Sequence, residues 1–248
     1  MSATSASVVL VVGASGGIGS ALCRRLVARG AKLVVAGRDE TKLGALAAEV
    51  GGDVVPLDAR NLDDVRDAVK GIVDRHGRLD GAVNLAGSIL LKPAHSTSAD
   101  EWDGVVATNL RTAFALVRAA APAMGQTGGG SIVLLSSAAA RLGLANHDAI
   151  AAAKAGIEGL ARSAAATYAS RGVRINAVAP GLVRTPLAAR IVHNEAALKA
   201  SEAMHALGRI GEPDDVASLV DYLLDPQHAW ITGQVFGVDG GLGTVRVR

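Results

Sequence analysis

Short apolar segments without polar alternation recur along the sequence, separated by helical segments. Strands of this kind should be buried on both faces, as in a parallel sheet covered by helices. Strands are predicted over Ser7–Val12, Lys32–Ala36, Asp53–Leu57, Gly81–Leu85, Ser131–Leu135, Val173–Ala179 and Gln234–Val238. Helices are predicted over Ile18–Ala28, Glu40–Val50, Leu62–Asp74, Asp103–Met124, Ala149–Ala169, Ala188–Leu207 and Pro213–Leu224. This alternation predicts a doubly wound α/β fold, with about seven parallel strands and helices on both faces of the sheet.

The composition limits the class of protein. Half of the 248 residues are apolar, which supplies a core and excludes intrinsic disorder. The 25 basic and 23 acidic side chains nearly balance, which argues against a nucleic-acid-binding protein. No linker and no internal repeat divides the chain, so we expect a single domain over residues 1–248.

Cysteine content and the N-terminus point to an intracellular protein. The one cysteine, Cys23, permits no intrachain disulfide, and we expect it to be a buried small side chain on a helix. No Cys/His cluster predicts a metal site. The N-terminus lacks the charged segment of a signal peptide, and its apolar run is too short to span a membrane. We therefore expect a cytoplasmic protein with no metal and no membrane or nucleic-acid partner.

A glycine-rich loop follows the first predicted strand and opens the first predicted helix. It reads Gly13-Ala14-Ser15-Gly16-Gly17-Ile18-Gly19. Glycines let the backbone turn sharply and approach a pyrophosphate, and the helix N-terminus offers free N–H groups and a positive dipole end. The position of the loop between a strand and a helix predicts a Rossmann-type, dinucleotide-binding domain.

The end of the second predicted strand indicates which dinucleotide is bound. NAD sites usually carry an acidic side chain about 20 residues after the loop, where it binds the ribose 2′-OH. Here Gly37 and Arg38 follow the strand, and the arginine suits the 2′-phosphate of NADP. We therefore predict NADP(H) as the cofactor and NAD as the less favoured one. An inward-pointing Asp39 would favour NAD instead.

Further motifs follow the third, fourth and sixth predicted strands. They are Asp58-Ala59, Asn84-Leu85-Ala86-Gly87, and the stretch from Pro180-Gly181 through Val183 to Thr185. Together with the glycine-rich loop, they make nearly the whole chain resemble the short-chain dehydrogenase/reductase family, although Leu85 replaces an asparagine of the family motif. The resemblance implies that the cofactor is bound by Gly13, Ser15, Gly17, Ile18, Gly19, Arg38, Asp58, Ala59, Asn84, Ala86, Gly87, Lys154, Pro180, Gly181, Val183 and Thr185.

The same resemblance implies catalytic roles, with one departure. Asn109 and Ser137 match the catalytic asparagine and serine of the family, and Lys154 matches the lysine of its Tyr-x-x-x-Lys motif. Ile150 occupies the position of the tyrosine, in the register that the spacing from Ser137 requires. Isoleucine cannot exchange a proton, and the loss of a positioned acid typically costs about 10²- to 10⁴-fold in rate.

Other side chains are candidates for the proton donor that the tyrosine would have supplied. Tyr168 lies about 27 Å further along the predicted helix, at 1.5 Å per residue, and Tyr222 is expected to pack. His147 precedes Ile150 by about one helical turn and is the strongest candidate, with a helix cap as its alternative role. Asp148 is more typical of a first-turn acid, and His95 is a weak candidate. The remaining histidines, His76, His193, His205 and His228, are predicted at the surface.

Two functions stay open at this point. The first is an NADP(H)-dependent oxidoreductase that reduces a small carbonyl, quinone or imine substrate without a tyrosine acid, because such activated substrates need less proton transfer. The second is an NADP-loaded scaffold or sensor without turnover. We expect residues 182–210 to cover a small or apolar substrate. The resemblance also implies a homo-oligomer, a dimer or tetramer, assembled through the helices near Asp103–Met124 and Ala149–Ala169.

Overall fold

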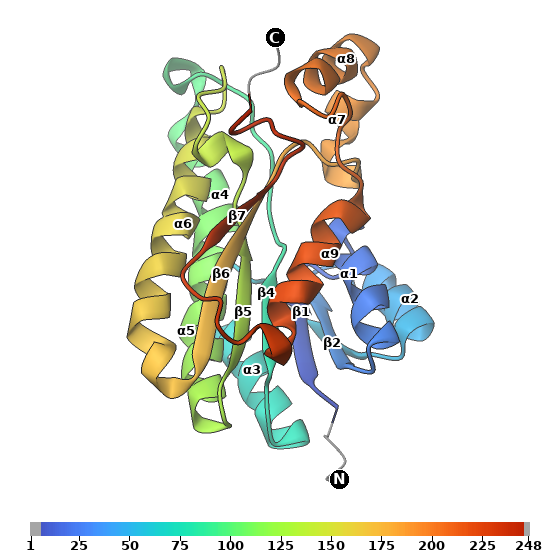
Figure 1. The fold of residues 1–248 in the computed structure, drawn as a ribbon, viewed down its shortest axis with the longest axis vertical. Helices are drawn as coiled ribbons and strands as arrows, with labels where there is room; N and C mark the ends of the chain where they lie inside the picture. The colour runs from blue at the N-terminus through green and yellow to red at the C-terminus, as the bar shows by residue number, and fades with distance from the viewer. Residues whose placement is uncertain (1–5, 246–248) are drawn as a thin grey trace.

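Seven parallel strands form one sheet in the order β3-β2-β1-β4-β5-β6-β7 (Figure 1). The computed structural model of the chain describes residues 6–245, so residues 1–5 and 246–248 of the predicted domain lie outside the described part. The strands are β1 Val8–Val12, β2 Lys32–Gly37, β3 Asp53–Pro56, β4 Gly81–Asn84, β5 Gly130–Leu135, β6 Val173–Pro180 and β7 Val235–Val238. The prediction of a doubly wound α/β fold is confirmed.

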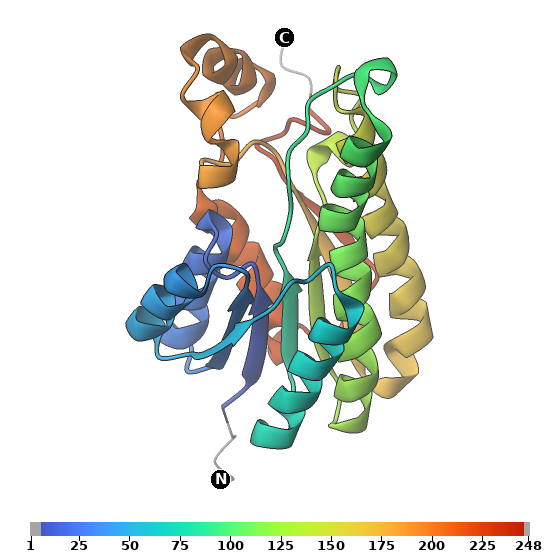
Figure 2. The ribbon, with the colours of Figure 1, turned by 180° about the vertical axis from the view of Figure 1, so that it is seen from behind.

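Helices cover both faces of this sheet. They are α1 Gly17–Ala28, α2 Glu40–Val50, α3 Leu62–His76, α4 Ala99–Val106, α5 Thr112–Gln126, α6 Asp148–Tyr168, α7 Ala189–Val192, α8 Glu195–Met204 and α9 Pro213–Leu224. Helices α1, α2 and α9 pack on one face, and α3, α5 and α6 pack on the other (Figures 1 and 2). The side chains of β1 alternate between the two cores, which explains why the strand is apolar at every position.

Cys23 belongs to the core between α1 and the sheet, as predicted. Burial raises the pKa of its thiol to about 12, because the thiolate would lose its hydration there. The thiol is therefore neutral at physiological pH and acts as a small apolar group.

The predicted helix Asp103–Met124 is helical throughout, but the helix begins earlier and contains a π-helical turn. A capping box begins α4 at Ala99, because the Ser98 hydroxyl accepts from the Glu101 N–H while the Glu101 carboxylate accepts from the Ser98 N–H. A π-helical turn over Ala107–Arg111 then separates α4 from α5. Such turns are rare and frequently found at functional sites.

The predicted helix Ala188–Leu207 is also interrupted. A short 3₁₀ turn, Pro186–Ala188, leads into α7, and Asn194 begins α8 by accepting a hydrogen bond from the Ala197 N–H at 3.0 Å. We call residues 185–207 the lid. Its base is closed by a bridge between Val183 and Gly211, and the lid stands beyond the carboxyl ends of the strands (Figure 1).

The order of the strands places the functional residues. The chain direction across the sheet reverses between β1 and β4, which are neighbours. In open α/β sheets, ligands bind beyond the carboxyl ends of the strands at such a switch point. The glycine-rich loop after β1 and the Asn84–Gly87 stretch after β4 both lie at this point.

Candidate active site

The glycine-rich loop has a backbone shape that side chains would obstruct. Gly13 has φ +80°, and a Cβ atom there would lie 2.9 Å from the Ala86 nitrogen. A Cβ atom on Gly19 would collide with the carbonyl oxygens of Gly13 and Ala14. Helix α1 then begins with neither a side-chain cap nor an acidic residue in its first turn. Its first N–H groups are thus available to an anionic ligand.

Two other predicted cofactor segments meet this loop. The loop contacts Leu85 and Ala86 at Gly13, and a Cβ atom on Gly17 would lie 2.8 Å from the Thr185 Cγ2 atom. Residues after β1, β4 and β6 therefore meet at one edge of the sheet. Ser15, Ile18, Pro180, Gly181 and Val183 lie in these same segments.

The side chain of Asn84 stabilises this edge. Its amide donates to the Thr112 hydroxyl at 3.0 Å, and its carbonyl oxygen accepts from the Ala86 N–H at 3.3 Å. Asn84 is buried, and both bonds hold the turn after β4. Its role in the fold is therefore to shape the backbone that precedes Gly87.

Arg38 and Asp39 differ in what their side chains do at the end of β2. The Asp39 carboxylate caps α2 by accepting from the Lys42 N–H at 3.0 Å, and it pairs with the Lys42 ammonium at 2.8 Å. These bonds lower the pKa of Asp39. The carboxylate thus points to the helix terminus, while Arg38 is exposed beyond the strand.

Asp58 lies across from Arg38, after β3. Its carboxylate accepts from the Arg60 guanidinium at 2.6 and 3.0 Å. Its pKa is lowered, chiefly by this hydrogen bonding and in smaller part by the charge of Arg38. Ala59 beside it is buried. Arg38 and Arg60 place positive charge at the carboxyl ends of β2 and β3. This charge would balance that of an additional phosphate.

Asn109 is the centre of the π-helical turn. Its Oδ1 atom accepts from the Ser88 N–H at 3.2 Å, and its Nδ2 atom donates to the Ser88 hydroxyl and the Val105 carbonyl, both at 3.0 Å. Sequence reasoning missed Ser88, whose only signal is its position directly after Gly87. These bonds join the π turn to the segment after β4.

Lys154 lies next to the same segment. A Cβ atom on Gly87 would be 3.8 Å from Lys154 Nζ and 3.1 Å from Asn109 Oδ1. The buried Nζ group donates to the Leu135 carbonyl at 2.7 Å. Burial lowers the pKa of the ammonium to about 8. The structure therefore brings Gly87, Asn109 and Lys154 together.

Ile150 lies one turn before Lys154 on α6 and is only 6% exposed. It packs with Val105, Ala149 and Ala153, and the partly buried Leu90 and Leu110 complete this apolar cluster. None of these five apolar side chains carries a proton donor, and the cluster suits an aliphatic side chain.

Ser137 and its neighbours connect the end of β5 to α6. The Ser137 hydroxyl oxygen accepts from the Ala139 N–H at 3.2 Å. Ser136 Oγ lies 3.1 Å from both the Lys154 carbonyl and Glu158 Oε1. The buried Glu158 carboxylate also accepts from Arg141 Nε at 3.0 and 3.1 Å. This pair holds the Ser137 turn against α6, and nothing in the spacing of Arg141 and Glu158 had indicated it.

The alternative proton donors have other partners in the structure. His147 is the N-cap residue of α6, and its Nδ1 atom lies 2.8 Å from the Ala145 carbonyl oxygen of its own loop. Asp148 Oδ2 accepts from the Ala94 N–H at 2.6 Å, and His95 is exposed in that neighbouring turn. Tyr168 ends α6, where Arg171 lies over its ring, and Tyr222 stacks on His228.

The prediction that His205 lies at the surface is wrong, since its exposed fraction is 3%. Its Nδ1 atom lies 2.6 Å from the Ser201 carbonyl oxygen, and its Nε2 atom accepts from the Leu182 N–H at 3.2 Å. The two contacts require a neutral ring with the proton on Nδ1. His205 thereby joins the end of α8 to the stretch after β6, a link over 23 residues that no sequence period indicates.

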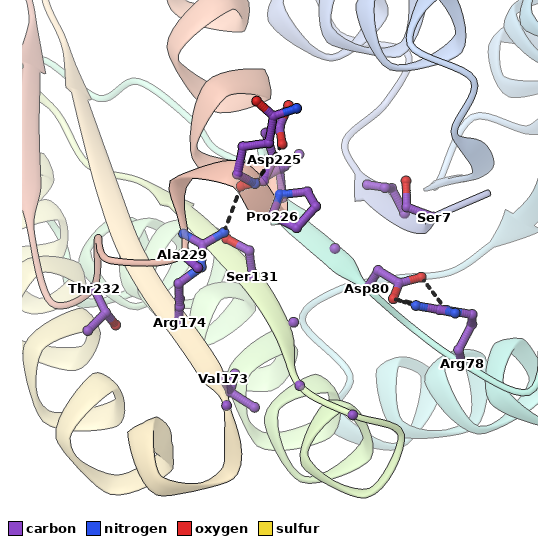
Figure 3. A pocket seen from close by; sticks show the side chains of 18 of the residues that line it. Ser7, Arg78, Asp80, Ser131, Val173, Arg174, Asp225, Pro226, Ala229 and Thr232 are labelled. Carbon is purple, nitrogen blue, oxygen red and sulfur yellow. Dashed lines mark hydrogen bonds and ion pairs between the residues drawn. The ribbon is translucent and has the colours of Figure 1, made fainter. Parts of the chain in front are cut away.

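A cavity of about 1230 Å³ lies at the opposite edge of the sheet, between the amino ends of the strands (Figure 3). Arg78 and Asp80 pair with each other there. Arg174 donates to the carbonyls of Leu223 and Ile231, which ties β6 to the segment after α9. The cavity is remote from the Gly87–Lys154 cluster, and its charged groups have structural partners.

Neither a membrane-spanning helix nor a metal-ligand cluster occurs in the part of the chain that the structure describes. No helix within residues 6–245 is long and apolar enough to cross a bilayer. Within the same range, no group of three or more His, Cys, Asp or Glu side chains is arranged to hold a metal ion.

Comparisons with known proteins agree with this geometry. The family model described as enoyl-(acyl carrier protein) reductase matches residues 13–243. A 3-oxoacyl-(acyl-carrier-protein) reductase of Synechocystis sp. is 36% identical over an alignment of 253 positions that covers 98% of this chain and 99% of the relative. A tropinone reductase homolog of Arabidopsis thaliana is 36% identical over an alignment of 242 positions that covers 94% of this chain and 88% of the relative.

Solved structures are similar over nearly the full chain. A short-chain type dehydrogenase/reductase from Mycobacterium ulcerans has a TM-score of 0.92 and 33% identity, covering 97% of this chain and 90% of that one. A variant of actinorhodin polyketide ketoreductase with NADPH has a TM-score of 0.91 and 31% identity, covering 99% of this chain and 100% of that one.

Proposed function

This chain belongs to the short-chain dehydrogenase/reductase family and is an oxidoreductase, and from that premise we propose that it uses NADP(H) to reduce a small carbonyl, quinone or imine substrate without a tyrosine general acid. The observation that carries the proposal is the cluster of Gly87, Asn109 and Lys154 beside an apolar Ile150. Asn109, Ser137 and Lys154 have the side-chain types that the resemblance assigns to catalysis, while the side chain of Ile150 offers no proton.

The binding residues support NADP(H) rather than NAD. Asp39 carries the carboxylate that would bind an unphosphorylated ribose. This carboxylate is already paired with the Lys42 ammonium and caps the start of α2. Arg38 is exposed at the same strand end and suits a 2′-phosphate. The solved actinorhodin ketoreductase variant was obtained with NADPH, which is consistent with this assignment.

The loop Gly13–Gly19 would hold the pyrophosphate at the start of α1, and Asp58 and Ala59 would lie beside the adenine. The segments Asn84–Gly87 and Pro180–Thr185, with Lys154, would hold the nicotinamide and its ribose. When bound, the cofactor supplies the hydride. Ser137 retains an O–H that can donate to a substrate oxygen or nitrogen, since its oxygen already accepts from Ala139.

The substrates proposed are those that need little acid assistance. An iminium carbon already carries positive character, and quinones and diketones stabilise the charge that develops on oxygen. Side chains around the carboxyl edge add a preference for apolar molecules. Ile89 and Leu91 after β4, and Leu187, Met204 and Leu207 in and beside the lid, are apolar and exposed. Figure 2 shows both segments beyond the same edge of the sheet.

Assembly as a homo-oligomer, a dimer or tetramer, is part of the proposal. The helices named for this role, α5 and α6, lie side by side on one face of the sheet (Figure 1). Phe114 on α5 is exposed although it is a large apolar side chain, which suits a surface covered by another copy. Sedimentation or light scattering of the purified chain distinguishes a monomer from these assemblies.

The function is tested by NADPH consumption with a panel of ketones, diketones, quinones and cyclic imines. We expect turnover of at least one activated class by the wild-type protein, and its loss in Lys154→Ala. Direct titration with NADPH and NADH accompanies the assay. NADPH binding without turnover of any class would favour the NADP-loaded scaffold, and a failure to bind either nucleotide would contradict both functions.

A further inference from the structure

Lys154 is a buried cation in the middle of the proposed active site. Its Nζ atom lies beside Gly87 and Asn109, at the carboxyl edge where the cofactor segments meet. It is on the same face of α6 as Ile150, one turn away. Any group that takes over the acid–base role at the position of Ile150 must lie within this small region.

The hydrogen bonds of Lys154 do not use all the N–H donors of its ammonium group. An ammonium has three N–H donors, and among the described residues the Leu135 carbonyl is the acceptor found for it. No described carboxylate forms an ion pair with it. Glu158, the next acidic group on this face of α6, is bound to Arg141 and Ser136.

The described residues found beside Lys154 carry no charge. Asn109 from the π turn and Gly87 and Ser88 after β4 are neutral, and Ile150 is apolar. A buried cation without a counter-charge is destabilised relative to its neutral form. Burial accordingly lowers the pKa of Lys154 to about 8, with no opposing contribution from a neighbouring charge. An acid with such a pKa is matched to proton transfer near neutral pH.

We infer that Lys154 is the general acid of this enzyme, donating to the substrate the proton that Ile150 cannot supply. The inference rests on the proposed reduction by NADPH. The substrate carbonyl carbon accepts a hydride from the cofactor, and its C=O π electrons move to the oxygen. As the new O–H bond forms, an N–H bond of Lys154 breaks. The products are an alcohol, NADP⁺ and a neutral Lys154 amine, which takes a proton from water.

His147, the other candidate, is held differently. Its Nδ1 atom is engaged with Ala145 in its own loop, and it is joined by no described contact to Gly87, Asn109 or Lys154. Loss of kcat in Lys154→Arg but not in His147→Ala would therefore separate the two residues.

The pH profile of kcat for NADPH-dependent reduction is the primary test. The acid must be protonated, so we expect kcat to be constant below about pH 8 and to fall about tenfold per pH unit above it. A kcat that already falls through pH ~6.5 would assign the acid to a histidine. A kcat that is independent of pH up to pH 10 would also overturn the inference.

Lys154→Arg separates proton donation from cofactor binding. Arginine keeps the charge and the hydrogen-bond donors but does not release a proton in proteins. We expect NADPH binding within about fivefold of wild type and kcat lower by about 10²- to 10⁴-fold. Lys70→Arg is the matched control, because Lys70 is exposed and paired with Asp74. It should leave kcat and its pH profile unchanged.

Rescue distinguishes a missing proton from a damaged fold. The double variant Ile150→Tyr/Lys154→Arg carries a phenol at the tyrosine position of the family. We expect it to recover at least tenfold in kcat over Lys154→Arg. Turnover by Lys154→Arg within threefold of wild type overturns the inference but leaves the oxidoreductase intact. Absence of turnover in the wild-type protein, with NADPH bound, overturns the proposed function itself and the inference with it.

Discussion

The glycine-rich loop after β1 and the first turns of α6 lie at the same edge of the sheet, but they depend on different properties of their residues. In the loop, Gly13 and Gly19 are required because backbone atoms occupy the space of a side chain. At the start of α6, the backbone would accept many residues, and Ile150 fills an apolar cluster without strain. A substitution in the loop therefore disturbs the whole cofactor-binding backbone. A substitution at position 150, by contrast, can change proton transfer while the fold stays intact.

The largest effect is expected at Gly19. A Cβ atom there meets the carbonyl oxygens of Gly13 and Ala14, which cannot move without opening the loop. Gly19→Ala should weaken NADPH binding by over ~100-fold, equivalent to about 3 kcal/mol. Gly44→Ala is the control, because the space around this exposed residue of α2 is open. Unaltered NADPH affinity in Gly19→Ala, measured by titration, would refute the steric explanation of the loop.

Ile150→Tyr probes the other region. Restoring a phenol one turn before Lys154 should raise the reduction of unactivated ketones by about 10²-fold. We expect the low end of the usual range because Lys154 already donates a proton. The tyrosine must also fit beside Leu90 and Leu110, so a lower melting temperature should accompany the gain. A folded variant with no gain in kcat would show that the substrate position differs from that in the family.

Arg38→Ala tests a side chain at the rim of the cofactor site. Removal of the guanidinium should weaken NADPH binding by about 10- to 100-fold and leave NADH binding nearly unchanged. Arg66→Ala, an exposed arginine paired with Asp63 and Asp67 on α3, serves as the control for a lost surface charge. Equal losses for the two nucleotides would contradict the assignment of the 2′-phosphate to Arg38.

A smaller effect is expected at His205, which fixes the lid to the stretch after β6. His205→Gln keeps an acceptor near the position of Nε2 for the Leu182 N–H, and His205→Asn instead keeps a donor near Nδ1 for Ser201. We expect His205→Asn, which loses the hydrogen bond to the Leu182 N–H, to raise the substrate KM about fivefold. The KM of His205→Gln, which keeps that hydrogen bond, should stay within twofold of wild type. A larger KM for His205→Gln than for His205→Asn would instead show that the contact with the Ser201 carbonyl positions the lid.

Local sequence signals were sufficient for much of the fold. Continuous apolar strands, the loop Gly13–Gly19 and the motifs after each strand predicted the parallel sheet and the edge where the site lies. These features depend on neighbouring residues and on backbone shape, which short stretches of sequence encode. The juxtaposition of Gly87, Asn109 and Lys154 followed from the resemblance, and the structure brings the three together.

Features that depend on distant partners were not predictable. The π turn around Asn109 is held by bonds to Ser88, the burial of Glu158 depends on Arg141, and that of His205 depends on Leu182. Each pairing joins residues 17 to 23 positions apart in different elements. The helix starts after Ser98 and Asn194 are set by capping side chains, which signal a helix start only weakly within an otherwise helical composition.

Single-turnover hydride transfer tests most directly whether chemistry survives without the tyrosine. The wild-type protein is loaded with NADPH, mixed rapidly with an activated diketone below pH 8, and followed by the absorbance of the reduced nicotinamide. We expect the absorbance to decay in one turnover, and the decay to be at least 10²-fold slower in Lys154→Arg with NADPH bound to the same extent. A stable absorbance in the wild-type protein, with NADPH bound and every substrate class tried, would contradict catalysis at this site.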